Sequence, residues 1–135
     1  MNAAIVREWL DHVDADLDAA WSCSRGPRAR LDRAAYLLQQ AAEKLVKAVL
    51  VSIGVDPPRT HDLAELAAEL SQDTPFRDRL SALSGLTPYA TGLRYPTPDE
   101  PPPVPSRERL DAWIAEVEAI RDGFERWLEE REAKA

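Results

Sequence analysis

Two long stretches in the first half of the chain carry apolar residues at intervals of three and four, the spacing of one face of an α-helix. The first covers residues 3–22, and its aspartates line a different face. The second runs from about Arg28 to Ile53 and is apolar over roughly half of a helical wheel, so we expect this helix to contact several neighbours. Gly54 predicts its C-terminal end, because glycine readily adopts the left-handed conformation found there.

The middle of the chain predicts a third helix and a short fourth one. The third begins near Thr60 or Asp62, because Asp62 and Glu65 have the spacing of a capping box. For the short helix, we expect Thr74 as the N-cap residue and a proline in the first helical position. Residues 86–93 either continue this helix or form a turn.

Proline dominates the segment before the last predicted helix. Six of the ten residues from Pro96 to Pro105 are proline, which favours an extended loop because proline lacks a backbone donor. Ser106 then opens a helix whose apolar stripe continues nearly to the C-terminus. We therefore expect one all-α domain over residues 1–135, an antiparallel four-helix-type bundle with an additional short helix and a proline-rich loop before the last helix.

Composition excludes several classes of protein. With 135 residues, of which 44% are hydrophobic, the chain can form a core without disulfides or a metal. Its single cysteine, Cys23, fits a reducing compartment, so we expect a cytoplasmic protein. No stretch approaches the roughly 20 apolar residues of a membrane span, and we expect neither export nor insertion. The net charge of -7 disfavours non-specific binding of nucleic acid, although one local phosphate site remains compatible with it.

The second predicted helix carries a polar cluster on the side away from its leucines, formed by Gln39, Gln40, Glu43, Lys44 and Lys47. Two interpretations stay open. The cluster could hold a phosphate or an acidic patch of a partner, which the presence of two of the chain's three lysines favours. Alternatively it is a solvated face, with Glu43 and Lys47 as an i,i+4 pair contributing a few tenths of a kcal/mol.

Three further residues are candidates for binding. His61 precedes a helix, where free backbone N–H groups attract anions, so it could contact a phosphate or instead fix the loop after Gly54. Arg94 and Tyr95 place a guanidinium beside an aromatic ring, which suits the phosphate and base of a nucleotide. A structural alternative is that Arg94 pairs with a carboxylate and Tyr95 packs the loop onto the bundle.

Other kinds of site receive no support from the residue spacings. Neither a zinc-ligand spacing nor a glycine-rich phosphate loop is present, and we expect no metal and no cofactor. The four tryptophans fall on apolar stripes, so the core or a dimer interface is the expected place for Trp9, Trp21, Trp113 and Trp127.

A set of motifs follows in order along residues 36–96: Tyr36, the run Gln39 to Lys44, Lys47, Gly54, the run Thr60 to Leu63, Tyr89, and Leu93-Arg94-Tyr95-Pro96. Together they resemble the HEPN family. The resemblance implies a helical bundle that usually dimerises and is frequently encoded beside a minimal nucleotidyltransferase, often as a toxin and antitoxin pair. Some members cleave RNA with a motif of Arg, four to six residues and His, contributed by two subunits.

This chain departs from the ribonuclease motif, because no histidine stands within that distance after Arg94. One literal match, from Arg7 to His12, lies in the first helix, where a spacing of five turns the two side chains about 140° apart. We expect it to be coincidental.

The sequence thus favours a non-catalytic, homodimeric HEPN module that engages a minimal nucleotidyltransferase or a nucleotide. The residues expected to bind are Lys44, Lys47, His61, Arg94 and Tyr95. Two alternatives remain. One is an RNA-cleaving toxin in which His61 or His12 acts with an arginine of the other subunit, and the other is a pure interaction scaffold.

Overall fold

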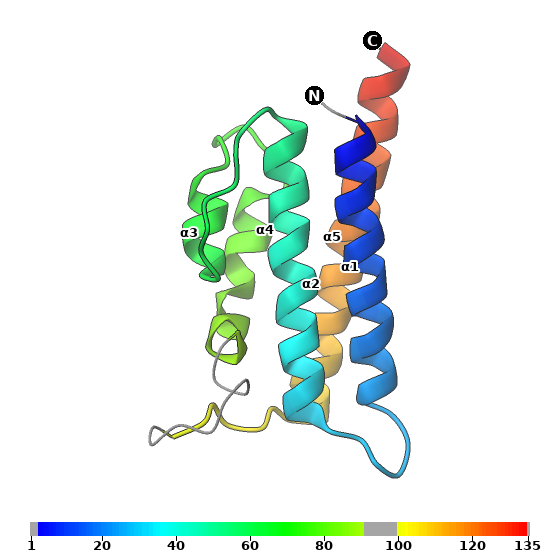
Figure 1. The fold of residues 1–135 in the computed structure, drawn as a ribbon, viewed down its shortest axis with the longest axis vertical. Helices are drawn as coiled ribbons and strands as arrows, with labels where there is room; N and C mark the ends of the chain where they lie inside the picture. The colour runs from blue at the N-terminus through cyan, green and yellow to red at the C-terminus, as the bar shows by residue number, and fades with distance from the viewer. Residues whose placement is uncertain (1–2, 91–99, 135) are drawn as a thin grey trace.

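Three long helices span the length of the molecule in the computed structural model, which describes residues 3–90 and 100–134 (Figure 1). They are α1 (Ala3–Cys23), α2 (Leu31–Ser52) and α5 (Arg107–Lys134). Beside α2, the fourth position of the bundle is filled by three short elements: α3 (Leu63–Ala68), α4 (Arg77–Ser81) and the 3-10 helix η1 (Ala82–Tyr89). The expected all-α, antiparallel bundle is confirmed, and no strand occurs in the described part of the chain.

Helix α2 lies at the centre and contacts α1, α3, η1 and α5. Its wide apolar face was expected, and the structure confirms it. Five fully buried alanines keep the helix narrow, so that its neighbours can approach closely: Ala34, Ala35, Ala41, Ala42 and Ala48. None of the helices in residues 3–90 and 100–134 is long and apolar enough to cross a membrane.

The ends of α2 differ in how well the sequence predicts them. Gly54 has a φ of +81°, and the Val55 N–H donates to the carbonyl of Leu50, so the predicted glycine stop is confirmed. The start lies at Leu31, three residues later than Arg28, because a turn that begins at Gly26 takes up the residues between.

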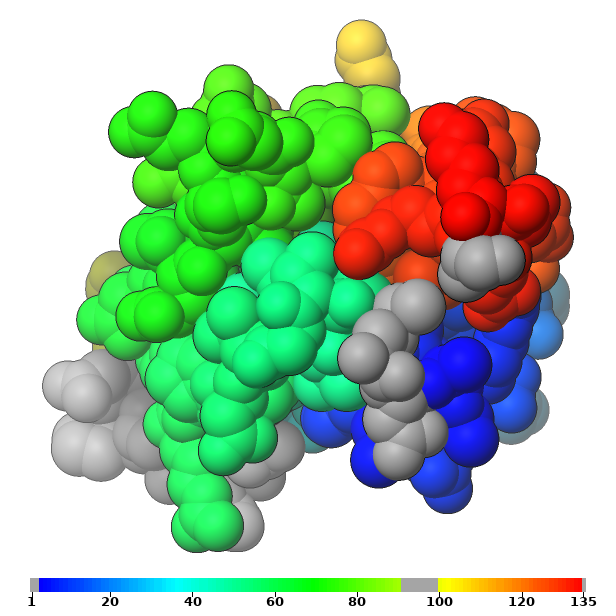
Figure 2. Space-filling view, turned by 90° about the horizontal axis from the view of Figure 1, so that it is seen from above, coloured from blue at the N-terminus to red at the C-terminus, as the bar shows by residue number. Residues whose placement is uncertain are grey.

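The connection after α2, the first turns of α1 and the last turns of α5 lie together at one end of the molecule (Figure 2).

Helix α3 begins as predicted, whereas α4 does not. The Asp62 carboxylate accepts hydrogen bonds from the backbone N–H groups of Ala64 and Glu65, which makes it the N-cap. The expectation that Thr74 caps α4 is wrong: its hydroxyl is bonded to that of Ser71, and α4 begins at Arg77. Packing of Phe76 against the rings of Phe124 and Trp127 sets this turn.

The chain after α4 continues in 3-10 geometry as far as Tyr89. Of the proline-rich segment, residues 100–106 are described, and they form neither helix nor strand. The Tyr89 hydroxyl donates to the carbonyl of Pro103. The Ser106 hydroxyl accepts from the backbone N–H of Arg109 at the start of α5, as the expected helix opening requires. Arg94 and Tyr95 lie outside the described residues.

Three of the four tryptophans, Trp9, Trp113 and Trp127, pack against the core. Trp21 does not, because half of its surface is exposed at the end of α1. The guanidinium of Arg25 lies 3.8 Å from the centre of this ring and covers one face of it. A core position for Trp21 is therefore ruled out.

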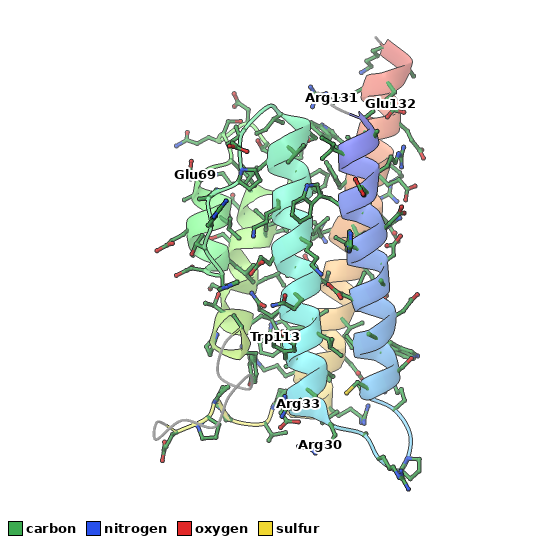
Figure 3. All side chains as sticks on the ribbon, viewed as in Figure 1. Arg30, Arg33, Glu69, Trp113, Arg131 and Glu132 are labelled. Carbon is green, nitrogen blue, oxygen red and sulfur yellow. The ribbon has the colours of Figure 1, made fainter. Side chains whose placement is uncertain are left out.

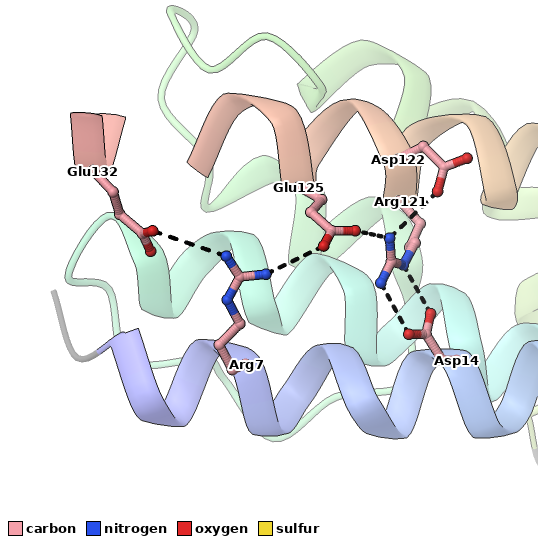
Figure 4. Close-up of polar contacts among 6 residues, drawn as sticks. All are labelled: Arg7, Asp14, Arg121, Asp122, Glu125 and Glu132. Atoms are coloured by element: carbon pink, nitrogen blue, oxygen red, sulfur yellow. Dashed lines mark hydrogen bonds and ion pairs between the residues drawn. The ribbon is translucent and has the colours of Figure 1, made fainter. Parts of the chain in front are cut away.

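A row of charged residues joins α1 to α5 (Figure 4). Arg121 donates from Nε and Nη2 to the two carboxylate oxygens of Asp14, at 2.8 and 2.9 Å, and also contacts Glu125. The hydrogen bonds to Asp14 raise the pKa of Arg121 further above its usual range. Arg7 reaches Glu125 at 3.4 Å and Glu132 at 3.9 Å, so it makes longer contacts with the same helix.

We expect Arg121→Met to lower the free energy of unfolding by about 1 kcal/mol, because it removes the bidentate ion pair with Asp14, which water screens in part. Arg7→Met, which removes only the longer pairs, should change it by less than about 0.5 kcal/mol. Urea denaturation of both variants checks the difference. Equal losses for the two would contradict a special role of the pair between Arg121 and Asp14.

Candidate functional site

Glu43 is a carboxylate in the middle of α2 with only 5% of its surface exposed. Its Oε1 atom accepts a hydrogen bond from His61 Nδ1 at 2.7 Å, and its Oε2 atom accepts one from Lys47 Nζ at 3.2 Å. Gln39 Nε2 is 3.3 Å from Oε1. We call these four residues the Glu43 cluster. It joins two turns of α2 to the residue before the α3 N-cap.

Gln39 extends this cluster to the backbone. Its side-chain N–H also donates to the carbonyl of His61 at 3.2 Å, and its own carbonyl oxygen accepts from Gln40 at 2.6 Å. Gln39 is fully buried. Of the two interpretations of this polar cluster, the solvated face does not hold for Gln39 and Glu43, because the loop between α2 and α3 covers that side of the helix.

The charges in the cluster balance one another. Burial alone would raise the pKa of the Glu43 carboxyl, but the hydrogen bond from His61, the charge of Lys47 and further hydrogen bonds from Gln39 and Lys47 together lower it below its usual value. The carboxylate is thus anionic at neutral pH. The predicted i,i+4 pair of Glu43 and Lys47 exists, but as a buried contact that fixes the fold and not as a surface pair.

His61 keeps one side of its ring accessible, since 47% of its side chain is exposed. Because Nδ1 is held by Glu43, Nε2 is the nitrogen left for a ligand or for proton transfer. Such a carboxylate-held imidazole suits an acid–base group, a phosphate contact or a metal ligand. Among the described residues, no group of three or more His, Cys, Asp or Glu is placed to bind a metal.

Lys44 faces α1, away from the Glu43 cluster. Its Nζ atom donates to Asp16 at 2.6 Å. The same lysine lines a hollow of about 390 Å³ between α1 and α2, together with Ile5, Glu8, Trp9 and His12. Of the five residues expected to bind, the structure brings Lys47 and His61 together, sets Lys44 apart from them, and does not describe Arg94 and Tyr95.

Arg7 and His12 point to different neighbours, as their spacing predicts. Arg7 pairs with Glu125 and Glu132 on α5, whereas His12 lines the hollow between α1 and α2. One chain therefore does not direct both side chains at one phosphodiester.

Some residues of these sites gave little or no signal in the sequence. The contact between Asp16 and Lys44 depends on how α1 and α2 pair, which no local pattern reveals. A second hollow, of about 400 Å³, is lined by Tyr89, Arg109 and Trp113 among others. Tyr89 belongs to the motifs that resemble the HEPN family. Trp113 falls on the apolar stripe of α5, so the sequence pattern does not distinguish it from a core residue.

Comparison with known proteins agrees with this fold. The HEPN domain model matches residues 6–127, so the chain belongs to the HEPN family. Its structure is similar to the crystal structure of TT1696 from Thermus thermophilus, with a TM-score of 0.70 and 24% sequence identity over 90% of this chain and 95% of that one. This likeness concerns the fold alone. No curated protein sequence matches the chain significantly.

We expect Glu43→Gln to lower the free energy of unfolding at neutral pH by about 1 to 3 kcal/mol, because His61 and Lys47 lose a buried anionic partner. The pKa of Glu43 is lower in the folded chain than in the unfolded chain. Its contribution is therefore complete above the unfolded value of about 4.3 and is lost as the pH falls through the folded value.

Urea denaturation at about pH 7 and about pH 3.5 measures this effect, and the gap between wild type and variant should shrink at the lower pH. Glu69→Gln, which changes an exposed carboxylate just after α3, serves as the control (Figure 3). A gap for Glu43→Gln that does not change with pH would contradict the role assigned to its charge.

Proposed function

We propose that this chain is a non-catalytic HEPN module that forms a homodimer and pairs with a minimal nucleotidyltransferase in a toxin–antitoxin-like unit, with a nucleotide as the associated ligand. The observation that carries this proposal is the Glu43 cluster. Glu43 holds His61 and Lys47 together. His61, the histidine of the family-like motifs, thereby has a role in fixing the loop before α3.

The arrangement of the arginines supports binding over RNA cleavage. Acid–base cleavage needs a histidine together with a group that stabilises charge developing on the phosphate, usually an arginine. Among the described residues, the side-chain partner of His61 is Glu43, and Arg7 and His12 face different helices. The sequence after Arg94 lacks the histidine of the ribonuclease motif.

The proposed binding region comprises Lys44, Lys47 and His61, together with Arg94 and Tyr95 from the part of the chain that the structure does not describe. When the imidazole is protonated, Nε2 on the exposed side of the His61 ring can donate a hydrogen bond to a phosphate or to a partner's carboxylate. Lys44 lies at a hollow that is large enough to accept a side chain of a partner. Both groups are held in place by carboxylates of this chain, which reduces the ordering required on binding.

A second candidate function, RNA cleavage by a dimer, is favoured by one feature. A carboxylate fixes His61 Nδ1 and leaves Nε2 facing outward, as in sites where a histidine transfers protons. An arginine from the second subunit would then complete the site.

Pairing and cleavage can be tested on one preparation. We expect the purified chain to bind a minimal nucleotidyltransferase with a Kd in the micromolar range or tighter and to leave single-stranded RNA intact. Arg94→Ala should weaken the pairing at least about tenfold, which corresponds to roughly 1.4 kcal/mol. Lys134→Ala, which removes a cation near the C-terminus, should leave it unchanged.

Two results would overturn the proposal. The first is the absence of any binding to a minimal nucleotidyltransferase. The second is RNA cleavage that disappears when His12→Ala and His61→Ala are combined, which would establish the catalytic alternative.

A further inference from the structure

The hollow of about 400 Å³ lies where η1, the proline-rich segment and the start of α5 meet. Its lining includes Gly85, Tyr89, Pro103, Arg109 and Trp113. The rings of Tyr89 and Trp113 meet edge to face, with their centres 6.3 Å apart. The hollow is thus walled by aromatic and proline rings at the end of the bundle where Trp113 lies in Figure 3.

The walls of this hollow are fixed by hydrogen bonds. The Tyr89 hydroxyl donates to the Pro103 carbonyl and ties the proline segment to η1. Burial raises the pKa of Tyr89 above its usual value, although the charge of Arg109 opposes this, so the phenol remains a donor at neutral pH. A pocket formed before its ligand arrives loses less entropy on binding.

Arg109 supplies a positive charge at this hollow. Its guanidinium lies 4.6 Å from the centre of the Trp113 ring. No carboxylate within the described residues pairs with it, although carboxylates pair with several other arginines of this acidic chain: Arg7, Arg25, Arg30, Arg79 and Arg121. An exposed guanidinium beside aromatic rings is available to an anion.

Gly85 provides an independent observation. It does not have a positive φ, so the backbone does not require glycine here. A Cβ atom at this position would lie 3.1 Å from Trp113 Cζ2 and 3.5 Å from Arg109 Nη2. Glycine therefore lets the indole of Trp113 pack directly against the backbone of η1, and a larger residue at this position would displace Trp113.

We propose that this hollow binds a planar heteroaromatic ring that carries a phosphate, with the ring packed against Trp113 and the phosphate held by Arg109. The guanidinium lies over the indole; in the complex it turns to the phosphate and the base takes its place, while Tyr89 and the proline segment keep their positions. Stacking of a base on an aromatic side chain contributes about 1 to 3 kcal/mol, and a guanidinium can donate two parallel hydrogen bonds to a phosphate. The volume of the hollow falls within the range of small-molecule sites.

This inference rests on the proposed function for the class of ligand, a nucleotide, and adds the place where it binds. The same chemistry is present in a free nucleoside monophosphate and in the 5′-phosphorylated end of an RNA strand. Both are therefore used as probes.

The test is isothermal titration calorimetry of the full chain with AMP, GMP, adenosine and a short 5′-phosphorylated RNA. We expect AMP or GMP, or the RNA, to bind, and adenosine to bind at least about tenfold more weakly than AMP if the free nucleotide is the ligand. Tighter binding of the RNA than of either nucleotide would identify a strand end as the source. Arg109→Ala and Gly85→Ala should each weaken binding at least about tenfold.

Arg131→Ala is the matched control. Arg131 lies 4.3 Å from the centre of the Trp127 ring at the other end of α5, so this variant removes the same kind of contact away from the hollow (Figure 3). It should leave binding unchanged. Thermal denaturation of each variant confirms that the fold is kept.

The inference is overturned if the wild-type chain binds none of the phosphorylated probes, or if Arg109→Ala binds them as tightly as wild type does. Equal weakening by Arg131→Ala would also overturn it. Pairing with the nucleotidyltransferase is measured on the same proteins. Intact pairing without nucleotide binding refutes this inference alone, whereas the absence of pairing in the wild-type chain refutes the proposed function.

Discussion

Glu43 is a charged group inside the most buried helix of the molecule, and a carboxylate there is stable only when its charge and hydrogen bonds are satisfied. One turn before and one turn after it, Gln39 and Lys47 provide two of the partners, but the shortest hydrogen bond comes from His61. His61 stands next to the α3 N-cap. The hydrogen bond that satisfies the Glu43 carboxylate therefore also fixes the connection between α2 and α3.

The position of the layer formed by α3, α4 and η1 follows from that constraint. Helix α3 packs on α2 and on η1, and η1 ends at Tyr89, which holds the proline segment before α5. The backbone N–H of Leu63 also donates to the Thr87 hydroxyl, which joins the start of α3 directly to η1. The Glu43 cluster and the aromatic hollow are therefore two ends of one layer, and a change at the first is expected to reach the second.

Local patterns in the sequence predicted what depends on local physics. The helical period located α1, α2 and α5, glycine geometry located the end of α2, and the Asp62 side chain located the start of α3. The errors concern tertiary contacts. A helical wheel places residues 39, 43 and 47 on one polar face, but only the packing of the α2–α3 loop makes that face an interior. The bonding of Thr74 to Ser71 and the pairing of Lys44 with Asp16 likewise depend on packing.

The most direct measurement of this account is a double-mutant cycle between Glu43 and His61, built from Glu43→Gln, His61→Ala and the combined variant and followed by urea denaturation at neutral pH. If the hydrogen bond between the two side chains organises the layer, the losses in unfolding free energy will be non-additive by about 1 kcal/mol or more. Additive losses, with a coupling energy below about 0.3 kcal/mol, would contradict it.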